Sequence, residues 1–223
     1  MIKLEYLQYK NDEKEPVVDV IYGDMVKNIV DGILFSGFKL TEQQLTDKYH
    51  ISRTPIREVL RRLETKGLIE IIKNRGAIVV GFSKRSYIDM LEERKALESL
   101  CISYAIERML DEEMELLTEN NQFLKFYYNT ADISTLSKIF KGFHQIVYHS
   151  TYNSRLREQM NFYFQCSNRK DILYSFYEEN LDEVYGYYNS LYQCFVDKNK
   201  EKAHVLMEKL MDLVIQYEIE NFR

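Results

Sequence analysis

Glycine and proline, the residues that most often interrupt helices and strands, are distributed very unevenly along this chain. Both prolines and six of the eight glycines precede residue 82, and only Gly142 and Gly186 lie in the remainder. These residues mark turns, so we expect a small domain with many turns followed by a larger domain of long helices. Net charge divides in the same way, with +1 on residues 1–82 and −6 on the rest. We therefore predict a domain boundary near Gly81–Ser83.

Composition excludes several classes of protein. Of the 223 residues, 45% are hydrophobic and 29% charged, which is typical of a globular protein and excludes wholesale disorder. The three cysteines (Cys101, Cys166 and Cys194) are widely spaced and odd in number, so we expect no disulfide framework and no cysteine-based zinc site. The first residues lack the pattern of a secretory signal, and no apolar run approaches the roughly 18 residues that cross a membrane. We therefore expect a cytoplasmic protein.

The early part of the chain predicts three helices. Residues 1–17 are an N-terminal extension, which is either a disordered arm or packed on the dimer, and their mixed charges favour a solvated arm. From Val18 to Phe35, apolar residues recur every three or four positions, and Ile33 is the last of this stripe. This spacing predicts an amphipathic helix, and Gly37 is expected to end it. A second helix is expected over residues 40–49, with Thr41 as its N-cap. A third is expected over residues 54–66, with Pro55 at its first position and Gly67 after its end.

A β-hairpin is expected after the third helix. Two β-branched runs, residues 68–72 and 77–80, flank the turn tetrad Lys73-Asn74-Arg75-Gly76. Three helices followed by a hairpin are the order of elements in a winged helix-turn-helix. We assign residues 18–82 to such a DNA-binding domain.

Positive charge gathers on the third helix and the hairpin. Residues 51–76 contain seven basic and three acidic residues, although the whole chain is acidic. Arg53, Arg57 and Arg61 are spaced by four and form one basic stripe on the helix. Contact with DNA phosphates requires such local positive charge, and arginine can also form bidentate hydrogen bonds to guanine. The alternative is a solvated helix face on which Arg57 and Arg61 pair with Glu58 and Glu64.

These residues resemble the GntR family of bacterial transcription regulators. The resemblance covers residues 18–82 and rests on Leu40-Thr-Glu-Gln-Gln-Leu-Thr, Ile51-Ser-Arg-Thr-Pro-Ile-Arg-Glu-Val-Leu-Arg-Arg-Leu-Glu, Gly67-Leu-Ile and Asn74-Arg-Gly-Ala. It implies operator contacts from the third helix and insertion of the hairpin, or wing, into the minor groove. Gln43 stands where fatty-acid-responsive members carry an arginine, so we expect different DNA contacts there. The candidate DNA-binding residues are Gln43, Arg53, Thr54, Pro55, Arg57, Arg61, Asn74, Arg75 and Gly76.

The rest of the chain, residues 83–223, predicts an all-α bundle of six to seven helices. Amphipathic stretches cover residues 83–108, 111–129, 133–150, 153–169, 171–197 and 200–222. The run Met90-Leu-Glu-Glu-Arg-Lys-Ala-Leu-Glu, and Phe143-His144 with Asn153 nine residues after the histidine, resemble the FCD effector-binding domain of the FadR branch of GntR proteins. This resemblance implies a dimerisation domain that binds a small molecule.

Many FCD domains hold a divalent metal through one aspartate and three histidines, and the resemblance allows each position to be checked. The aspartate position holds Phe140, the second histidine position Tyr188 and the third Leu210, so only His144 remains. One imidazole cannot hold zinc or nickel. We therefore expect no metal and no other cofactor. The alternative is a site restored by a shifted alignment of the last helices, with His204 as the displaced ligand.

Tyrosine is the other distinctive feature of the second half. Thirteen of the 18 tyrosines follow residue 100. They are either core and dimer-interface residues or the lining of a pocket, in which Arg94 pairs with a carboxylate or phosphate. Arg94 could equally pair with Glu98 on the surface, and His144 could be a hydrogen-bonded core residue. The candidate effector-binding residues are Arg94, His144, Tyr188 and Tyr192, and the candidate ligand is a small organic acid.

The sequence favours a homodimeric transcription regulator, a repressor that binds a palindromic operator and responds to a metabolite. A ligand-independent regulator and a regulator with a retained metal site are the alternatives within this class. An enzyme is disfavoured because the chain has no nucleophile elbow, phosphate-binding glycine loop or paired metal-spaced histidines. A winged helix that binds only protein is disfavoured by the arginine stripe.

Overall fold

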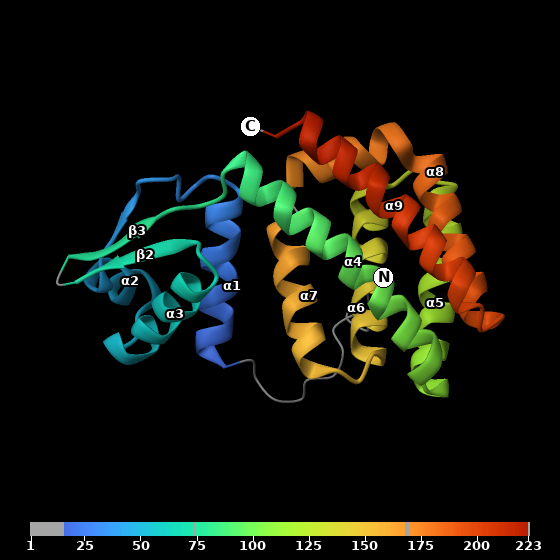
Figure 1. The fold of residues 1–223 in the computed structure, drawn as a ribbon, viewed down its shortest axis with the longest axis horizontal. Coiled ribbons are helices and arrows are strands. Elements are labelled where there is room, and N and C mark those ends of the chain that lie inside the picture. Colours follow the sequence, from blue (N-terminus) through green and yellow to red (C-terminus); the bar gives the residue numbers. More distant parts are fainter. Residues whose placement is uncertain (1–15, 74, 168–169, 223) are drawn as a thin grey trace. The chain divides into compact units, whose positions relative to one another are not determined.

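The computed structural model describes residues 16–73, 75–167 and 170–222. The chain forms two compact units, Met1–Ser86 with Gln165–Arg169 and Tyr87–Phe164 with Lys170–Arg223. The first unit contains three helices and a small sheet, and the second is helical throughout its described part (Figure 1). The expected fold class, a winged helix-turn-helix followed by an all-α bundle, is confirmed.

The first helix, α1 (Val17–Val30), buries the stripe Ile21, Met25, Val26 and Ile29 against the rest of the first unit. The prediction that it extends to Phe35 was wrong. Gly32 has a φ of +72° and its N–H donates to the Ile29 carbonyl, so the helix stops there and not at Gly37. Ile33 and Phe35 are 63% and 61% exposed.

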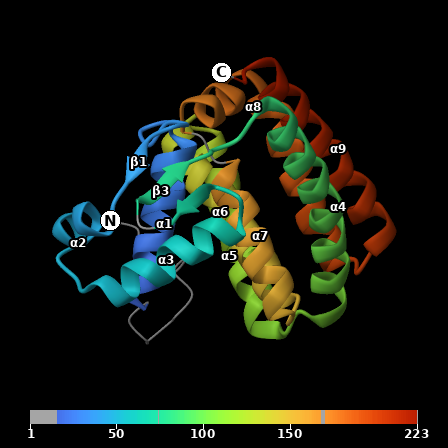
Figure 2. The same cartoon turned by 60° about the vertical axis from the view of Figure 1, so that its left-hand side comes forward.

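Helix α2 (Glu42–Tyr49) and helix α3 (Arg53–Thr65) form the helix-turn-helix (Figure 2). Thr41 caps α2 as expected, in a reciprocal capping box with Gln44. Helix α3 buries Ile56, Val59, Leu60 and Leu63 on one face. It begins one residue earlier than predicted, so Pro55 is its third residue and not its first. The missing N–H of Pro55 still carries no cost, because the first four N–H groups of a helix have no partner within it.

A three-stranded antiparallel sheet completes the first unit. The expected hairpin consists of β2 (Ile69–Ile72) and β3 (Gly76–Val79). A short strand that the sequence did not predict, β1 (Lys39–Leu40), pairs with the other side of β3, so the order is β1-β3-β2. Gly76 has a φ of +90°, and a Cβ there would lie 2.2 Å from the Leu40 carbonyl oxygen. Only glycine therefore allows β1 and β3 to approach at this point.

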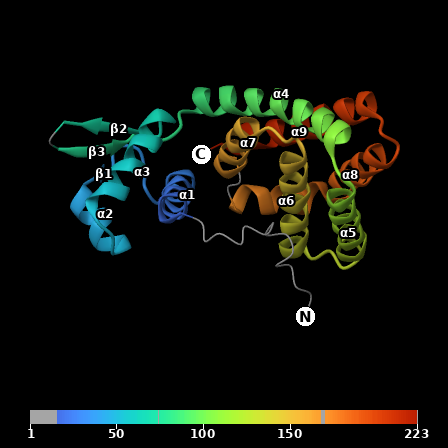
Figure 3. The ribbon, with the colours of Figure 1, turned by 90° about the horizontal axis from the view of Figure 1, so that it is seen from below.

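Six helices follow in the described part of the second unit, close to the predicted ranges (Figure 3). They are α4 (Lys84–Arg108), α5 (Asp111–Tyr128), α6 (Ile133–Ser150), α7 (Ser154–Cys166), α8 (Lys170–Val196) and α9 (Lys200–Glu220). Helix α8 is interrupted at Asn180, whose φ of −123° and ψ of 21° are not helical. Helices α4 and α9 lie side by side (Figure 2), and Lys95 of α4 forms an ion pair with Asp212 of α9.

Candidate DNA-binding face and the core of the helical unit

The face of α3 opposite its buried side carries three arginines. Arg53, Arg57 and Arg61 are all exposed and are spaced by four along the helix, so they project from neighbouring turns. Thr54, in the first turn, is exposed as well. The N-terminal part of α3 thus exposes the short side chain of Thr54 beside the cationic side chains of Arg53 and Arg57.

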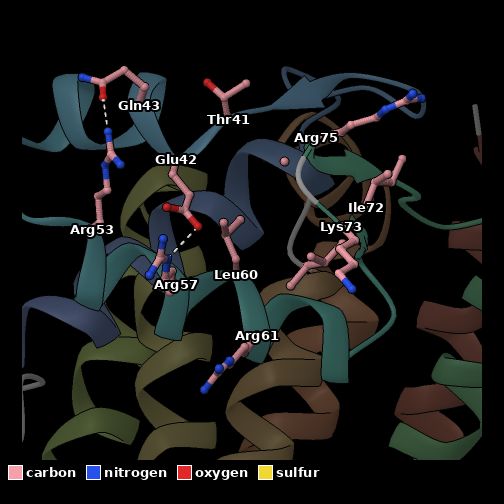
Figure 4. A pocket seen from close by; sticks show the side chains of 12 residues that line it. Thr41, Glu42, Gln43, Arg53, Arg57, Leu60, Arg61, Ile72, Lys73 and Arg75 are labelled. Carbon is pink, nitrogen blue, oxygen red and sulfur yellow. Dashed lines mark hydrogen bonds and ion pairs between the residues drawn. The ribbon is translucent and has the colours of Figure 1, made fainter.

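The three arginines border an open groove of about 610 Å³ between α2, α3 and the hairpin (Figure 4). Lys73 and Arg75 of the hairpin line it together with Arg53, Arg57 and Arg61. Among the described residues, the guanidinium groups of Arg61 and Arg75 and the ammonium group of Lys73 have no ion-pair partner. The groove therefore combines cations from α3 with cations from the hairpin. Asn74, the remaining candidate of the turn tetrad, lies outside the described residues.

Helix α2 holds two of the arginines of α3 (Figure 4). The Nε of Arg57 donates to Glu42 at 2.8 Å, and the Nη2 of Arg53 donates to the side-chain oxygen of Gln43 at 3.1 Å. Gln43 in turn donates to Asp47 at 2.9 Å. The hydrogen bond from Arg57 lowers the pKa of Glu42, so this carboxylate is ionised in the pair.

Arg57 therefore does not follow the alternative in which it pairs with Glu58 or Glu64 of its own helix. Its partner is Glu42, and Glu64 accepts a hydrogen bond from the backbone N–H of Ile71 at 3.0 Å. Sequence reasoning missed Glu42. The signal available was its position beside Gln43 at the start of α2, but only the packing angle of α2 on α3 brings it to Arg57.

Arg62 belongs to another surface than the stripe. Its Nη1 pairs with Asp19 of α1 at 2.5 Å, and its guanidinium lies over the ring of Tyr22 at 4.6 Å from the centroid. Arg62 is one of the seven basic residues of positions 51–76, and these contacts link α3 to α1.

A buried polar cluster occupies the core of the helical unit. Arg94 and Glu98 lie one turn apart on α4, and His144 and Tyr148 lie one turn apart on α6, with Tyr188 added from α8. Glu98 is 0% exposed and the other four are at most 6% exposed. We refer to these five residues as the Glu98 cluster.

The carboxylate of Glu98 is the centre of this cluster. It accepts from the Nε and Nη2 of Arg94 at 3.2 and 3.1 Å, and from the hydroxyl of Tyr148. The Nδ1 of His144 lies 3.2 Å from its second oxygen, and the Nε2 of His144 lies 2.8 Å from the hydroxyl of Tyr188. Both carboxylate oxygens thus have hydrogen-bond donors.

Electrostatics in the Glu98 cluster favours the ionised carboxylate. Burial alone raises the pKa of Glu98, but His144, Arg94 and the hydroxyl of Tyr148 outweigh it and lower the pKa to about 2. Burial acts to lower the pKa of Arg94, but the charge of Glu98 outweighs it and raises this pKa. Burial raises the pKa of Tyr148 and of Tyr188, so both hydroxyls stay protonated and can donate.

The structure brings together three of the four candidate effector-binding residues. Arg94, His144 and Tyr188 belong to the Glu98 cluster, whereas Tyr192 places its hydroxyl 3.2 Å from that of Thr118. The expected pairing of Arg94 with Glu98 exists, but it is buried and not on the surface. Tyr148 was missed, although its position four residues after His144 on a helix could have indicated it.

Two family models match the chain. The model of the bacterial regulatory proteins of the gntR family matches residues 18–79, and the FCD domain model matches residues 89–213, which is more than half of the chain. The chain belongs to the GntR family. It is a DNA-binding transcription regulator with an FCD effector-binding domain, and not an enzyme.

Several transcription regulators resemble the chain over different lengths. The HTH-type transcriptional regulator YdhC of Bacillus subtilis is 23% identical over 89% of this chain and 90% of its own length. The gluconate operon transcriptional repressor of Bacillus licheniformis is 25% identical over 55% of this chain and 48% of its own length. Among solved structures, McbR/YncC of Escherichia coli shares the fold with a TM-score of 0.70 at 20% identity, covering 93% of this chain and 100% of that one.

The residues of this FCD domain do not fit the divalent metal that many such domains hold. Phe140 stacks on Tyr188 with the ring centroids 4.5 Å apart, so two of the positions where ligands are expected carry aromatic rings in contact. Leu210 is buried and apolar, and His144 is already bonded to Glu98 and Tyr188. Within residues 16–73, 75–167 and 170–222, no group of three or more His, Cys, Asp or Glu side chains could hold a metal ion.

In the described part of the chain, none of the helices combines the length and the apolar character needed to cross a membrane.

Proposed function

We propose that this GntR regulator acts in the cytoplasm as a homodimer on a palindromic operator, and that it represses transcription. The observation that carries the proposal is the groove of about 610 Å³ bordered by exposed cations of α3 and of the hairpin. Two such faces related by two-fold symmetry would meet two half-sites of a palindrome. The relative from Bacillus licheniformis named as a repressor supports the direction of control.

In this proposal α3 enters the major groove. Arg53 and Arg57 contact guanine edges or phosphates, and Thr54 reaches a phosphate or a base edge. Pro55 shapes the first turn of α3, and Arg61 contacts the backbone farther along. Arg53 and Arg57 each exchange a protein partner for DNA, because Gln43 and Glu42 hold them in the free protein.

The hairpin is proposed to reach the adjacent minor groove. Arg75 would supply the charge there, and Asn74 completes the turn as a candidate contact. Gly76 shapes the hairpin for this contact, because its lack of a side chain allows β3 to approach β1 closely. Gln43 acts on DNA recognition through Arg53, which it orients.

The helical domain is proposed to bind a small metabolite that changes operator binding, with an organic acid as the candidate. Arg94, His144 and Tyr188 converge in its core and offer the hydrogen-bond donors that a carboxylate needs. Tyr192 lies on the same helix as Tyr188 and completes the set. A ligand acting there would shift the population between poses of the two DNA-binding units.

Selection of genomic DNA fragments by the purified protein tests this proposal. We expect enrichment of fragments that share one palindrome, and binding of one dimer per palindrome by light scattering of the complex. The variant Arg53→Ala/Arg57→Ala should lose this enrichment, while Glu208→Ala, which removes a half-exposed side chain of α9, should retain it. Enrichment of no common sequence, or one chain bound per site, would contradict the proposal.

A further inference from the structure

The carboxylate of Glu98 is fully buried in the core of the helical unit. Its side chain is 0% exposed, yet it is ionised and held by donors from two helices. Its partners Arg94, His144 and Tyr148 are each at most 6% exposed. An unpaired charge at this depth is strongly destabilising. The buried donors therefore require an anion, and the buried carboxylate requires the donors.

The donors surround the carboxylate from different directions. Arg94 approaches from one turn earlier on α4, while His144 and Tyr148 approach from α6. The ring of Phe164 lies against the guanidinium of Arg94, with 5.1 Å between the Cζ and the ring centroid. Tyr188 fixes the far nitrogen of His144. The result is a cradle that is shaped for a carboxylate and enclosed by aromatic rings.

We infer that Arg94, His144 and Tyr148 form a carboxylate-binding cradle that this chain fills with its own Glu98. The side chain of Glu98 is an internal ligand in the core of the FCD domain, where a metal ion does not fit. An organic acid that acts at this site must displace Glu98 from these donors. This inference deepens the proposed effector site and rests on its location, but it does not depend on operator binding.

Replacing Glu98 tests the cradle directly. Glu98→Ala removes the same non-hydrogen atoms that make up acetate, so acetate can restore the lost carboxylate. We expect the Tm of Glu98→Ala to fall well below that of the unaltered protein in chloride. Sodium acetate at about 100 times its Kd should raise this Tm by roughly 5–10 °C over sodium chloride of equal ionic strength. Acetamide, which is neutral and of nearly the same shape, should have no such effect.

Three further variants control the result. The unaltered protein and Glu208→Ala, which loses an exposed pair with His204, should gain no more than about 1 °C from acetate. Arg94→Ala/Glu98→Ala should not be rescued, because the cation that binds the acetate is missing. Should Glu98→Ala not fold in chloride, the fraction refolded in acetate is the readout. Glu98→Ser, which leaves similar room but keeps a hydroxyl, serves as the second variant.

Rescue of Glu98→Ala or Glu98→Ser by acetate alone supports the cradle. Equal Tm values in acetate, chloride and acetamide for both variants overturn it, as does equal stabilisation of the unaltered protein by acetate. Refolding of neither variant in acetate also overturns it. Operator binding is measured separately on the unaltered protein in chloride. A failure there contradicts the proposed function and leaves the acetate result standing.

Discussion

The carboxylate of Glu42, the first residue of α2, lies 2.8 Å from the Nε of Arg57 on α3. The two helices of the DNA-binding unit therefore share a charge pair on the face that is proposed to meet the operator. Arg57 remains 59% exposed on its side chain, so solvent and salt weaken the pair. A phosphate or a guanine edge can replace Glu42 at small cost, and the pair orients Arg57 before DNA arrives.

Arg57→Ala is expected to weaken operator binding by about 1–3 kcal/mol, or roughly tenfold to a hundredfold, and to leave the fold intact. The reason is the loss of a bidentate donor from the exposed face of α3. Fluorescence anisotropy with the selected operator measures it. Arg62→Ala is the matched control, because Arg62 pairs with Asp19 of α1, and it should change operator affinity less than twofold. Unchanged binding by Arg57→Ala would mean that α3 is not the recognition helix.

Glu42→Gln is expected to tighten binding to DNA of unrelated sequence by about two- to fivefold. The substitution removes a negative charge beside the groove and releases Arg57 to any phosphate. Binding to the operator should tighten less, because Arg57 is then less well oriented, so the ratio of the two affinities falls. Anisotropy titrations of both duplexes at one salt concentration measure the ratio. An equal change on both duplexes would assign Glu42 a purely electrostatic role.

The DNA-binding unit could be predicted from sequence because its signals are local. The spacing of Ile56, Val59, Leu60 and Leu63 determines the buried face of α3, and the same spacing places the arginines on the other side. The pair of Glu42 with Arg57 depends on how two helices cross, which no local pattern encodes. Strand β1 is only two residues long and exists because β3 pairs with it, so alternation could not reveal it.

The Glu98 cluster was predictable only in part for the same physical reason. His144 and Tyr188 are 46 and 90 residues from Glu98 along the chain, and only the packing of three helices brings them together. Spacing by four made the pair of Arg94 with Glu98 visible, but burial of that pair depends on the helices that cover it.

The early end of α1 was missed because Gly32 and Gly37 could both end a helix, and α1 ends before the first of them.

Gly76→Ala is expected to destabilise the DNA-binding unit by at least about 1–3 kcal/mol. A Cβ at this position would lie 2.2 Å from the backbone oxygen of Leu40, and the φ of +90° is itself unfavourable for alanine. Urea unfolding followed by circular dichroism measures the loss. Gly23→Ala is the control, because Gly23 lies within α1 and an added Cβ would meet no atom within 4 Å. Alanine there should stabilise the helix by about 0.5–1 kcal/mol. Equal stability of the two variants would contradict the close approach of β1 and β3.

The purified protein is expected to carry no stoichiometric zinc, nickel or manganese. Phe140, Tyr188 and Leu210 cannot replace the ligands that such an ion requires, and His144 is engaged in the Glu98 cluster. Elemental analysis after dialysis against buffer without chelator measures the content. Thermal shift with and without EDTA is the second measurement, and the two Tm values should agree within about 1 °C. One bound ion per chain would mean that other residues than those at the expected FCD ligand positions hold the metal.

The stability of the helical unit is expected to fall in acid through Glu98. The pKa of this carboxyl is lowered from 4.5 to about 2 in the folded protein. A lowered folded-state pKa means that the unfolded chain binds the proton more tightly. The contribution of Glu98 is therefore fully present above about pH 4.5 and is lost as the pH falls toward 2, on the order of 3 kcal/mol in total. Glu98→Gln cannot titrate, so its Tm should be lower at neutral pH but should fall less steeply between pH 5 and about 2. If the Tm of Glu98→Gln and of the unaltered protein fall equally steeply with pH, other carboxylates control the loss of stability in acid. The ionised Glu98 then does not hold the three helices together.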